Sequence, residues 1–556
     1  MRGGPHRPGD DWAVALESAH REFASLAWRG PAAASTKPAD TDKVTTNPRQ
    51  RNFAAPSTRL HRRALALAAS VLLSSCAVGP AYQRPAPPTV PGYTTAPVAT
   101  VIPSAPAAPG PAAGAQTLAY GATVDTRWWT DFGSPALDRL VAQALAHNPD
   151  LAAAQATLEQ AQYNLKAAQG VFYPQVSLGL GAERTQASGA ASGGLSGPQL
   201  YNLYTGQVSV SYAPDVFGLN RLVTRGEQAQ VDVARAQWAA ARLTIEGNVV
   251  NTAFDLAALE DELAATRKNV GDQQQILALT RIRYRLGETS QFDVLTQESQ
   301  LASSEAQLPQ LQQARDKARH LLAVYLGQFP AAAGNLAAPA LADLRLPAAL
   351  PVSLPSTLVR QRPDIVAAEA QLRAANAQVG ETVARMYPNL QLSAGFGSQS
   401  NRADAFFDPA SRLWNLAANL VAPLFDGGTL AAQKQAAQAA YRAVFANYQS
   451  TVLGAFRNVA DVLRALQHDA ALLDAQARAT HSAQQALELV RTQYQAGAVD
   501  YLSLLTSETQ YQNARIALVQ VQAQRYADTA ALYLAMGGGK WMTASARSGS
   551  TQTGAR

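Results

Sequence analysis

The only cysteine of the chain, Cys76, gives the clearest sign of chemistry in the sequence. Two arginines, an apolar run and small residues lead up to it in the segment LHRRALALAASVLLSSC, residues 60–76. Such a segment is typical of a signal peptide and is too short to stay as a membrane-spanning helix. Leu73-Ser74-Ser75-Cys76 matches a bacterial lipobox, in which the cysteine becomes the acylated N-terminus. We predict a diacylglycerol and an N-acyl lipid on Cys76; an ordinary cleavage site that happens to contain cysteine is the alternative.

No other set of residues has the spacing that catalysis or metal binding requires. The seven histidines are scattered and none has zinc-ligand spacing. Gly537-Gly538-Gly539-Lys540 lacks the leading glycine and the following Ser/Thr of a phosphate-binding loop, and no Gly-x-Ser-x-Gly elbow occurs. A single cysteine allows no internal disulfide. We therefore expect no enzyme activity, no metal and no cofactor beyond the lipid.

The charge of the chain argues against a nucleic-acid partner. The formal net charge is +6, but residues 1–75 hold eleven Lys/Arg and six Asp/Glu, which leaves the remainder near +1. No basic stripe with interleaved aromatic residues is present.

Two internal repeats organise the elements that would position any functional surface. RIRYRLGETSQFDVLTQESQL, residues 281–301, matches RTQYQAGAVDYLSLLTSETQY, residues 491–511, without gaps. Residues 148–181 match 362–395 in the same way, including a shared Tyr-Pro and Tyr-x-x-Gly. We interpret these matches as an internal duplication, although alanine-rich helices also resemble one another by chance.

A long helical segment precedes each copy of the 281–301 motif. Leu222 to Leu286 is a proline-free segment of about 65 residues, or roughly 97 Å as a helix, and Thr429 to Ala496 is similar. Short glycine turns predict antiparallel return helices after each, and apolar spacings of three and four predict coiled-coil packing. Pro149 predicts a kink or a break in the helical segment 134–170.

Four segments alternate between apolar and polar residues with a period of two, as half-buried strands do. Their apolar positions include Val176, Leu178 and Leu180, and similar sets occur in 207–212, 390–396 and 415–420. Aromatic residues flank these segments, as they do in strands of a transmembrane barrel, although either pair taken alone favours a soluble hairpin with one buried face. Loops rich in Gly, Ser and Asp separate the strands of each pair, at 186–199 and 398–411. Four strands cannot close in lipid, so other copies must complete the barrel, and three copies give twelve strands.

Taken together, these motifs resemble the TolC-type outer membrane factors, in the NodT/OprM-like lipoprotein branch that serves RND efflux systems. The resemblance covers Cys76 to about Trp541 and rests on the order of CAVGPAYQRP, WWTDFGSPALDRLVAQALAHNPDL, FYPQVSLGLG, APDVFG, two RxxYxxG turns, RPDIVAAEAQLRAANAQVG, APLFDGG and GGGKW. It implies a trimer with a twelve-stranded outer-membrane barrel, four strands from each chain. A long antiparallel α-helical coiled-coil tunnel would continue from the barrel, with a collar near 118–131, 327–354 and the C-terminal end. By resemblance to other lipoproteins, Ala77 after the cysteine favours outer-membrane sorting.

The resemblance also implies a function and its surfaces. The chain would be the passive exit duct of a tripartite efflux system, reached through a periplasmic adaptor protein from an inner-membrane RND pump. The adaptor would contact the two tip turns, Arg285, Leu286, Gly287, Glu288, Thr289, Ser290 and Gln495, Ala496, Gly497, Ala498, Val499, Asp500. Related proteins close the tip with acidic residues, whereas this chain has Gln484, Gln485 and Glu488 in the candidate gate region. Two alternatives stay open: an exit duct for type I secretion, and a lipid-anchored coiled-coil scaffold without a pore.

The expected organisation follows the repeats. A disordered or non-native leader (1–58) and a signal peptide (59–75) precede a Pro/Ala-rich linker from the lipid anchor (76–116). The first repeat (117–330), an equatorial connector (331–354), the second repeat (355–541) and a disordered tail (542–556) follow.

Overall fold

The computed structural model describes residues 78–90, 92–96, 98–187, 199–539 and 541. All of them belong to one unit of the chain, Ser70–Arg556. The predicted lipid site Cys76, the leader, the signal peptide and the C-terminal tail lie outside the described residues and stay predictions.

The predicted break at Pro149 is confirmed as two helices, α3 (Pro135–His147) and α4 (Pro149–Gln169). Asn148 lies between them with an extended backbone, and its side chain accepts hydrogen bonds from the backbone N–H groups of Asp150 and Leu151. Proline is favoured at the first position of a helix because that position needs no N–H donor. The proline therefore starts a helix here and does not bend one.

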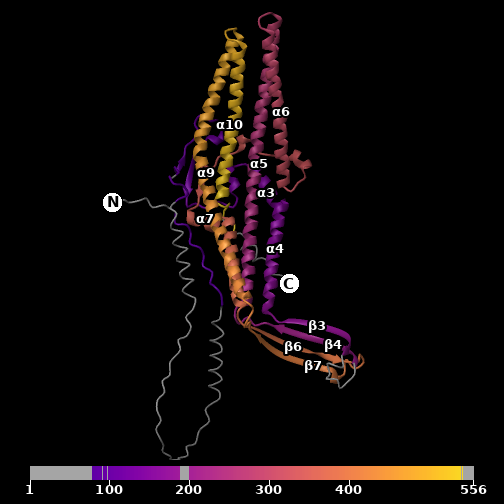
Figure 1. The fold of residues 1–556 in the computed structure, drawn as a ribbon. Helices are drawn as coiled ribbons and strands as arrows, with labels where there is room; N and C mark the ends of the chain where they lie inside the picture. Colours follow the sequence, from indigo (N-terminus) through magenta and orange to yellow (C-terminus); the bar gives the residue numbers. More distant parts are fainter. Residues whose placement is uncertain (1–77, 91, 97, 188–198, 540, 542–556) are drawn as a thin grey trace, which may run out of the picture. The chain divides into compact units, whose positions relative to one another are not determined.

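Two long helical hairpins dominate the chain (Figure 1). The first joins α5 (Leu219–Arg285) to α6 (Gln291–Tyr325), and the second joins α9 (Thr429–Gln495) to α10 (Tyr501–Ala535). The long helix has 67 residues and the return helix 35 residues in both hairpins, close to the predicted bounds. At 1.5 Å per residue the long helices measure about 100 Å. Within the described ranges, no helix has the length and hydropathy needed to cross a bilayer.

The helices pack in rows of four. In the half next to the strands, α5 packs between α4 and α8 (Pro363–Ala384), and α9 packs against α8; the short helix α7 (Pro355–Gln361) precedes α8. In the other half the row is α6, α5, α10, α9. In this half the two hairpins of one chain therefore meet along α5 and α10.

The four alternating segments form one antiparallel sheet in the order β3 (Gln175–Ala187), β4 (Gln199–Tyr212), β6 (Asn389–Ser400) and β7 (Arg412–Val421). The register aligns Leu178, Val208, Phe396 and Trp414 across all four strands. Residues paired across a sheet share a face, so the apolar positions form one continuous surface. Ser177, Ser209, Gly395 and Asn415 align on the opposite face.

The strand β4 is longer than predicted, and the prediction of a loop over 186–199 was wrong at both of its ends. The ladder continues from Gly179 with Gln207 to Ala187 with Gln199. Gly206 interrupts the apolar alternation in the sequence. In the structure the ring of Phe406, from the β6–β7 connection, lies where its side chain would be, 2.6 Å from an ideal Cβ. Likewise, β6 extends to Ser400, so that three residues of the other predicted loop (398–411) belong to the strand.

A second, three-stranded sheet joins distant segments near the middle of the long helices. β2 (Gln116–Tyr120) pairs antiparallel with β1 (Val101–Ile102) and parallel with β5 (Ala349–Val352). The aromatic segment Trp128–Phe132 lies within the same core, where Trp128 stacks on Tyr533 with ring centroids 5.4 Å apart. The core thus draws on segments that we predicted for the collar.

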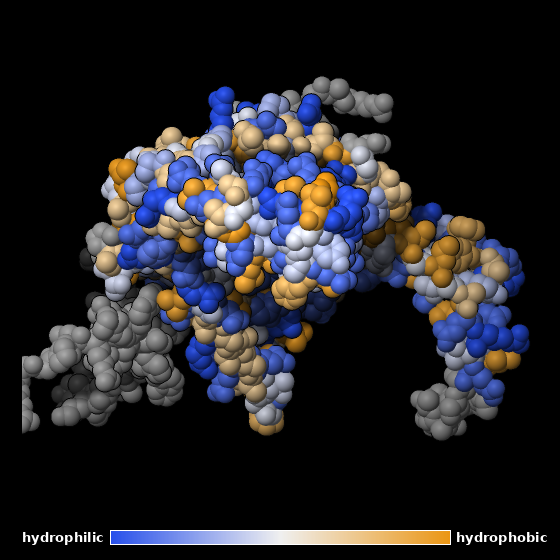
Figure 2. Space-filling model, turned by 90° about the horizontal axis from the view of Figure 1, so that it is seen from above, coloured by the Kyte–Doolittle hydropathy of each residue, from blue (hydrophilic) through white to orange (hydrophobic). Residues whose placement is uncertain are grey.

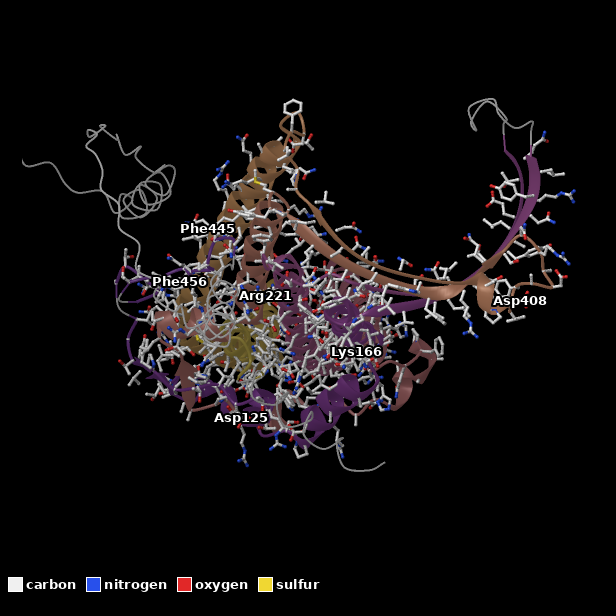
Figure 3. The ribbon with its side chains drawn as sticks, turned by 90° about the horizontal axis from the view of Figure 1, so that it is seen from below. Asp125, Lys166, Arg221, Asp408, Phe445 and Phe456 are labelled. Carbon is white, nitrogen blue, oxygen red and sulfur yellow. The ribbon has the colours of Figure 1, made fainter. Side chains whose placement is uncertain are left out.

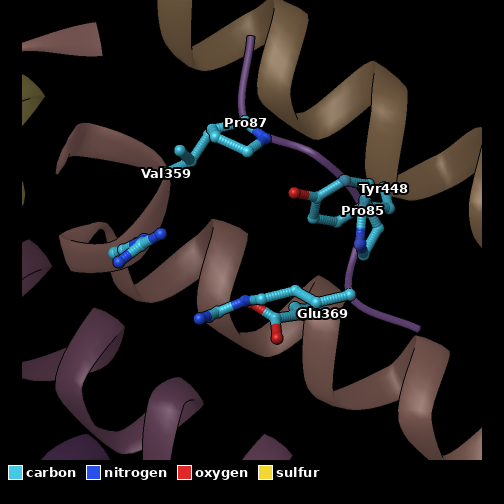
Figure 4. Close-up of a pocket in the computed structure, with 7 residues that line it drawn as sticks. Pro85, Pro87, Val359, Glu369 and Tyr448 are labelled. Atoms are coloured by element: carbon cyan, nitrogen blue, oxygen red, sulfur yellow. The ribbon is translucent and has the colours of Figure 1, made fainter. Parts of the chain in front are cut away.

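The N-terminal strap, which we define as the described residues of 78–115, lies along the helices. Gly79 packs on Gly380, and Asn376 donates to the Pro80 carbonyl oxygen over 3.1 Å. Arg84 forms an ion pair with Glu369 at 2.5 Å, beside Pro85, Pro87 and Tyr448 (Figure 4). The strap ends where the buried Arg525 of α10 donates to the carbonyl oxygens of Ala112 and Gly114, each over 2.8 Å.

Candidate functional site: the connected ends of the two hairpins

The two tip turns have the same backbone geometry. In the first, the N–H of Glu288 donates to Arg283 O over 2.9 Å and the N–H of Gly287 to Tyr284 O over 3.0 Å. In the second turn, the N–H of Ala498 donates to Gln493 O over 2.8 Å and the N–H of Gly497 to Tyr494 O over 3.0 Å. These pairs of bonds define the Schellman motif, whose glycine requires a left-handed backbone. Gly287 and Gly497 have φ of 78° and 74°, and a Cβ at either position would meet no atom within 4 Å, so only the backbone requires glycine.

Each return helix starts at a capping side chain. Ser290 and Asp293 form a reciprocal capping box at the start of α6, and Asp500 accepts from the N–H of Ser503 at the start of α10. Partial burial opposes ionisation of Asp293, but hydrogen bonds from Thr289 and Ser290 outweigh it and lower the pKa of this carboxyl. A bond from the Ser503 hydroxyl lowers the pKa of Asp500. Both turns are therefore fixed, charged connections.

The predicted tip residues occupy these turns. Arg285 and Gln495 are the last residues of α5 and α9, and Leu286 and Ala496 are their C-caps. Figure 2, seen from the side of the hairpin ends, shows a mostly hydrophilic surface with separate hydrophobic residues. Leu286 is 68% exposed and Phe292 75% exposed, so large apolar side chains are available there. Adaptor contact at these turns stays a prediction.

One arginine of the first hairpin holds the end of the second. Arg283 donates to the backbone oxygens of Tyr494 and Gln495 over 3.0 and 2.9 Å. Its guanidinium lies 4.6 Å from the centroid of the Tyr494 ring. A cation at a helix C-terminus complements the helix dipole, and the ring adds a cation–π contribution. We call these contacts the Arg283 tie.

The two copies of the repeat contain an ion pair at equivalent positions, which the sequence analysis did not predict. Arg281 lies 2.6 Å from Glu298 within the first hairpin, and Arg491 lies 3.8 Å from Glu508 within the second. The first pair is exposed, whereas Glu508 is 3% exposed and neither of its carboxyl oxygens has a hydrogen-bond partner in the described part of the chain. Burial raises the pKa of Glu508 to about 7. The second copy of the pair therefore holds a carboxyl that is costly to ionise.

Glu508 belongs to a buried polar seam between the hairpins. Tyr501 donates to the side-chain oxygen of Gln297, whose amide donates to Gln273 O over 3.2 Å. Further along, Asn269 donates to Gln512 over 2.7 Å. Buried members recur at intervals of seven, the coiled-coil core spacing: Thr266, Gln273 and Thr280 on α5, Gln297 and Ser304 on α6, and Tyr501 and Glu508 on α10. The sequence analysis missed this seam, although the seven-residue spacing of polar residues is visible in the sequence.

The candidate gate residues lie on another face. Gln484, Gln485 and Glu488 are exposed on α9, where Gln484 donates to Glu488 over 3.0 Å, while Leu487 points into the hairpin core. These three side chains thus point away from the chain's own bundle. Their role as a gate stays a prediction.

Nothing in the described ranges assembles three or more His, Cys, Asp or Glu side chains into a metal-binding group. At the hairpin ends, the helices contact one another through hydrogen bonds, ion pairs and aromatic rings.

Comparison with known proteins gives this architecture a family. The family model described as "Outer membrane efflux protein" matches residues 140–328 and 354–538. The pyoverdine export outer membrane protein OpmQ of Pseudomonas putida is 34% identical over 424 residues, 75% of this chain and 88% of its own length. Outer membrane protein OprJ of Pseudomonas aeruginosa is 28% identical over 480 residues, 85% of this chain and 95% of its own. Nodulation protein T of Rhizobium leguminosarum is 27% identical, over 84% of this chain and 96% of its own length.

Solved structures agree with the sequence comparison. The outer-membrane channel OprN superposes with a TM-score of 0.74 at 26% identity, covering 84% of this chain and all of that one. VceC of Vibrio cholerae superposes with a TM-score of 0.70 at 29% identity, covering 75% of this chain and 99% of that one. The two helical hairpins and the strand sheet are thus the fold of efflux channels. The chain belongs to the outer membrane efflux protein family, in its TolC-type, NodT/OprM-like branch, and is an efflux exit duct of the Gram-negative outer membrane.

Proposed function

We propose that the working unit is a trimer in which three copies of the four-stranded sheet close a twelve-stranded barrel. The single observation that carries this proposal is that both outer edges of the sheet, β3 and β7, lack a strand partner in the described part of the chain. Open edges are not tolerated in lipid. Antiparallel order is preserved if β7 of one copy pairs with β3 of the next, because β3 and β7 run in opposite directions.

The helices support the same closure. Each row of four helices has two end members: α4 and α9 in the half next to the strands, α6 and α9 in the other. Leu453, Leu472 and Leu489 of α9 are 67%, 51% and 60% exposed, so the helix that ends both rows leaves several large apolar side chains uncovered in a single chain. Three rows placed end to end form a ring of twelve helices around a duct. The recurring element order and the repeats favour an origin by duplication.

The strap supports lipidation of Cys76. Its first described residues pack on Gly380, four residues before the end of α8 and close to the start of β6. A lipid attached just before the strap would therefore enter the membrane that holds the sheet. The arrangement favours a lipoprotein anchored beside its own barrel.

We infer that the tip turns receive a periplasmic adaptor, which links the duct to an inner-membrane RND pump. Two similar turns in each chain give six sites in a trimer. The relatives export different cargoes, since one is named for pyoverdine and CusC of Escherichia coli for cations. We propose that the chain conducts small molecules selected by the pump. An exit duct for type I secretion is the second candidate, and the proposed lipid anchor argues against it.

The Arg283 tie supports a closed resting state. It joins the two hairpins of one chain at the end where the helices of a ring converge, so the second hairpin cannot move outward until the tie breaks. The adaptor and pump would supply that energy, since a ligand shifts an equilibrium only by its differential affinity for the two states.

The test is single-channel conductance of the full, processed protein in planar bilayers, with the mass of the detergent-solubilised particle and of its N-terminal peptide determined beside it. We expect a trimer with small, mostly closed currents and an acylated Cys76. A monomer or dimer that never conducts would overturn the duct and favour a scaffold without a pore. An unmodified Cys76 in a conducting trimer would remove only the anchor.

A further inference from the structure

We propose that the connection between β6 and β7, residues 401–411, is an anchor for lipid: Phe406 fixes it to the apolar face of the sheet, and Phe407 inserts among acyl chains near the outer surface of the membrane. This inference rests on the proposed barrel. It assigns a lipid contact to a loop that the sequence indicated only as a connection rich in Gly, Ser and Asp. Figure 3 shows Asp408, a member of this loop, at the part of the sheet remote from the helices.

The loop has a defined structure of its own. Ser398 donates to the Phe406 carbonyl oxygen and, over 3.2 Å, to that of Ser411. Ser411 in turn donates to Ala405 O over 2.7 Å. These bonds fold the loop back on the end of β6.

The register of the sheet shows on which face the loop lies. Gly206 pairs with Leu180 on one side and with Ser398 on the other, so all three share the apolar face. The Phe406 ring lies 2.6 Å from an ideal Cβ at Gly206, and a Leu180 methyl lies 3.2 Å from it. Only glycine, which has no side chain, leaves room for the Phe406 ring at this position. The loop therefore leans on the apolar face, which a barrel turns toward lipid.

The neighbouring ring is left uncovered. Phe407 is 87% exposed and meets Phe406 edge to face, with ring centroids 5.0 Å apart. On the same face, Leu180 and Trp414 are each 77% exposed. Large apolar side chains are unfavourable in water, so these exposed rings and aliphatic groups indicate an apolar environment.

The rest of the loop is polar in a way that suits a membrane surface. Arg402 and Asp404 form an ion pair at 2.5 Å with side chains 71% and 67% exposed. Aromatic rings beside charged groups are typical of the boundary between acyl chains and headgroups. The occupant of this surface is therefore the acyl region of a lipid leaflet.

The experiment measures how deep a spin label lies in phosphatidylcholine nanodiscs that contain the full processed protein. Three variants with one added cysteine each are labelled: Phe407→Cys at the proposed anchor, Asn401→Cys as an exposed polar position of the same loop, and Leu178→Cys in the apolar face of β3. Collision with oxygen reports acyl chains and collision with a water-soluble nickel complex reports water. The parental protein, treated with the same reagent, gives the background from Cys76.

We expect the label at position 407 to collide at least threefold more with oxygen, relative to nickel, than the label at position 401. A label at 407 that behaves like the label at 401 overturns the anchor, provided that position 178 reports lipid. A label at 407 shielded from both reagents also overturns it, because a second copy of the chain would then cover the loop. If position 178 also reports water, the sheet is not in the bilayer and the proposed barrel fails first.

Two further variants test whether the space at Gly206 holds Phe406 on the sheet. In the Phe407→Cys background, Gly206→Ala is expected to push Phe406 off the sheet and to move the label at 407 into water, with the label at 178 unchanged. Phe406→Ser releases the loop without altering the sheet, in case the alanine variant does not assemble. A label that keeps its depth in both variants contradicts the role of Phe406.

Discussion

Single residues at the hairpin ends show how similar sequences acquire different roles. The two turns need glycine for one shared reason, a left-handed backbone at the end of a long helix. Around them, Arg281 and Arg491 are matched arginines with matched glutamates, yet Glu298 is partly exposed and Glu508 is buried. Local backbone chemistry is therefore shared between the hairpins, while side-chain burial is not.

Replacing Gly497 with alanine should loosen the second turn. A non-glycine residue in the left-handed region costs about 1–2 kcal/mol, and the Cβ meets no other atom within 4 Å, so backbone strain alone should act. Hydrogen exchange of the amides at 498–504 should become roughly tenfold faster. Gly271→Ala, within α5 and equally free of contacts, should be neutral or stabilising because alanine favours helix. Equal effects of both changes would contradict this account.

The burial of Glu508 predicts a pH dependence of the hairpin ends. Its pKa is raised to about 7 from an ordinary value of 4.5, so the folded state binds more protons than the unfolded state between these values. Stability is then highest below about pH 4.5 and decreases as pH rises to about 7. Once exchange rates are corrected for the intrinsic pH dependence of amide exchange, the amides of residues 487–512 should be better protected at pH 5 than at pH 8. Glu508→Gln should remove that slope and stabilise the region at pH 8 by roughly 1–3 kcal/mol, whereas the exposed Glu305→Gln should keep the slope.

At the scale of elements, the sequence predicted what depends on local pattern. The break at Pro149, both long hairpins and the presence of four strands are confirmed because caps, glycine turns and period-two alternation are local signals. The length of β4 was not predictable, since Gly206 breaks the alternation and only the distant Phe406 completes it. The strap contacts and the polar seam depend on which helices meet in space, and the sequence does not state this directly.

Arg525 is the element-scale test of the strap. It is fully buried and donates to two strap carbonyl oxygens, and burial lowers its pKa although Asp469 opposes the effect. Arg525→Met keeps much of the volume but leaves those oxygens without their donor, at a cost of about 2–4 kcal/mol. The variant should unfold at lower temperature and expose the strap to protease. Arg457→Met, at a site on α9 where the arginine is 81% exposed, should change neither measurement.

At the scale of the whole molecule, the sheet and both helix rows end without a partner among the described residues, and we propose that three copies close them together. The family and the fold of the relatives support a duct, and the Arg283 tie joins its two hairpins within each chain. In the proposed arrangement, the two hairpins of one chain would separate before the duct widens.

Arg283→Ala should therefore raise conductance. The change removes two hydrogen bonds to the end of α9 and the contact with Tyr494, so the second hairpin moves outward more readily. Single-channel recordings should show currents severalfold larger or more often open than those of the parent. Arg267→Ala, at an exposed position of the same helix, should give parental currents. Unchanged currents for Arg283→Ala would mean that closure lies elsewhere, for example at Gln484, Gln485 and Glu488.

The paired arginine and glutamate have an evolutionary consequence. Because Glu298 is in solvent, substitutions there should be accepted freely, and that hairpin can drift or adapt its exterior to new partners. Glu508 is enclosed by neighbours that must change with it, so its hairpin should evolve slowly and in correlated steps. A saturation library read out by survival under toxic cargo should find many tolerated residues at position 298 and few at 508. One ancestral contact would then have become an adaptable outer surface in one copy and a constrained interior in the other.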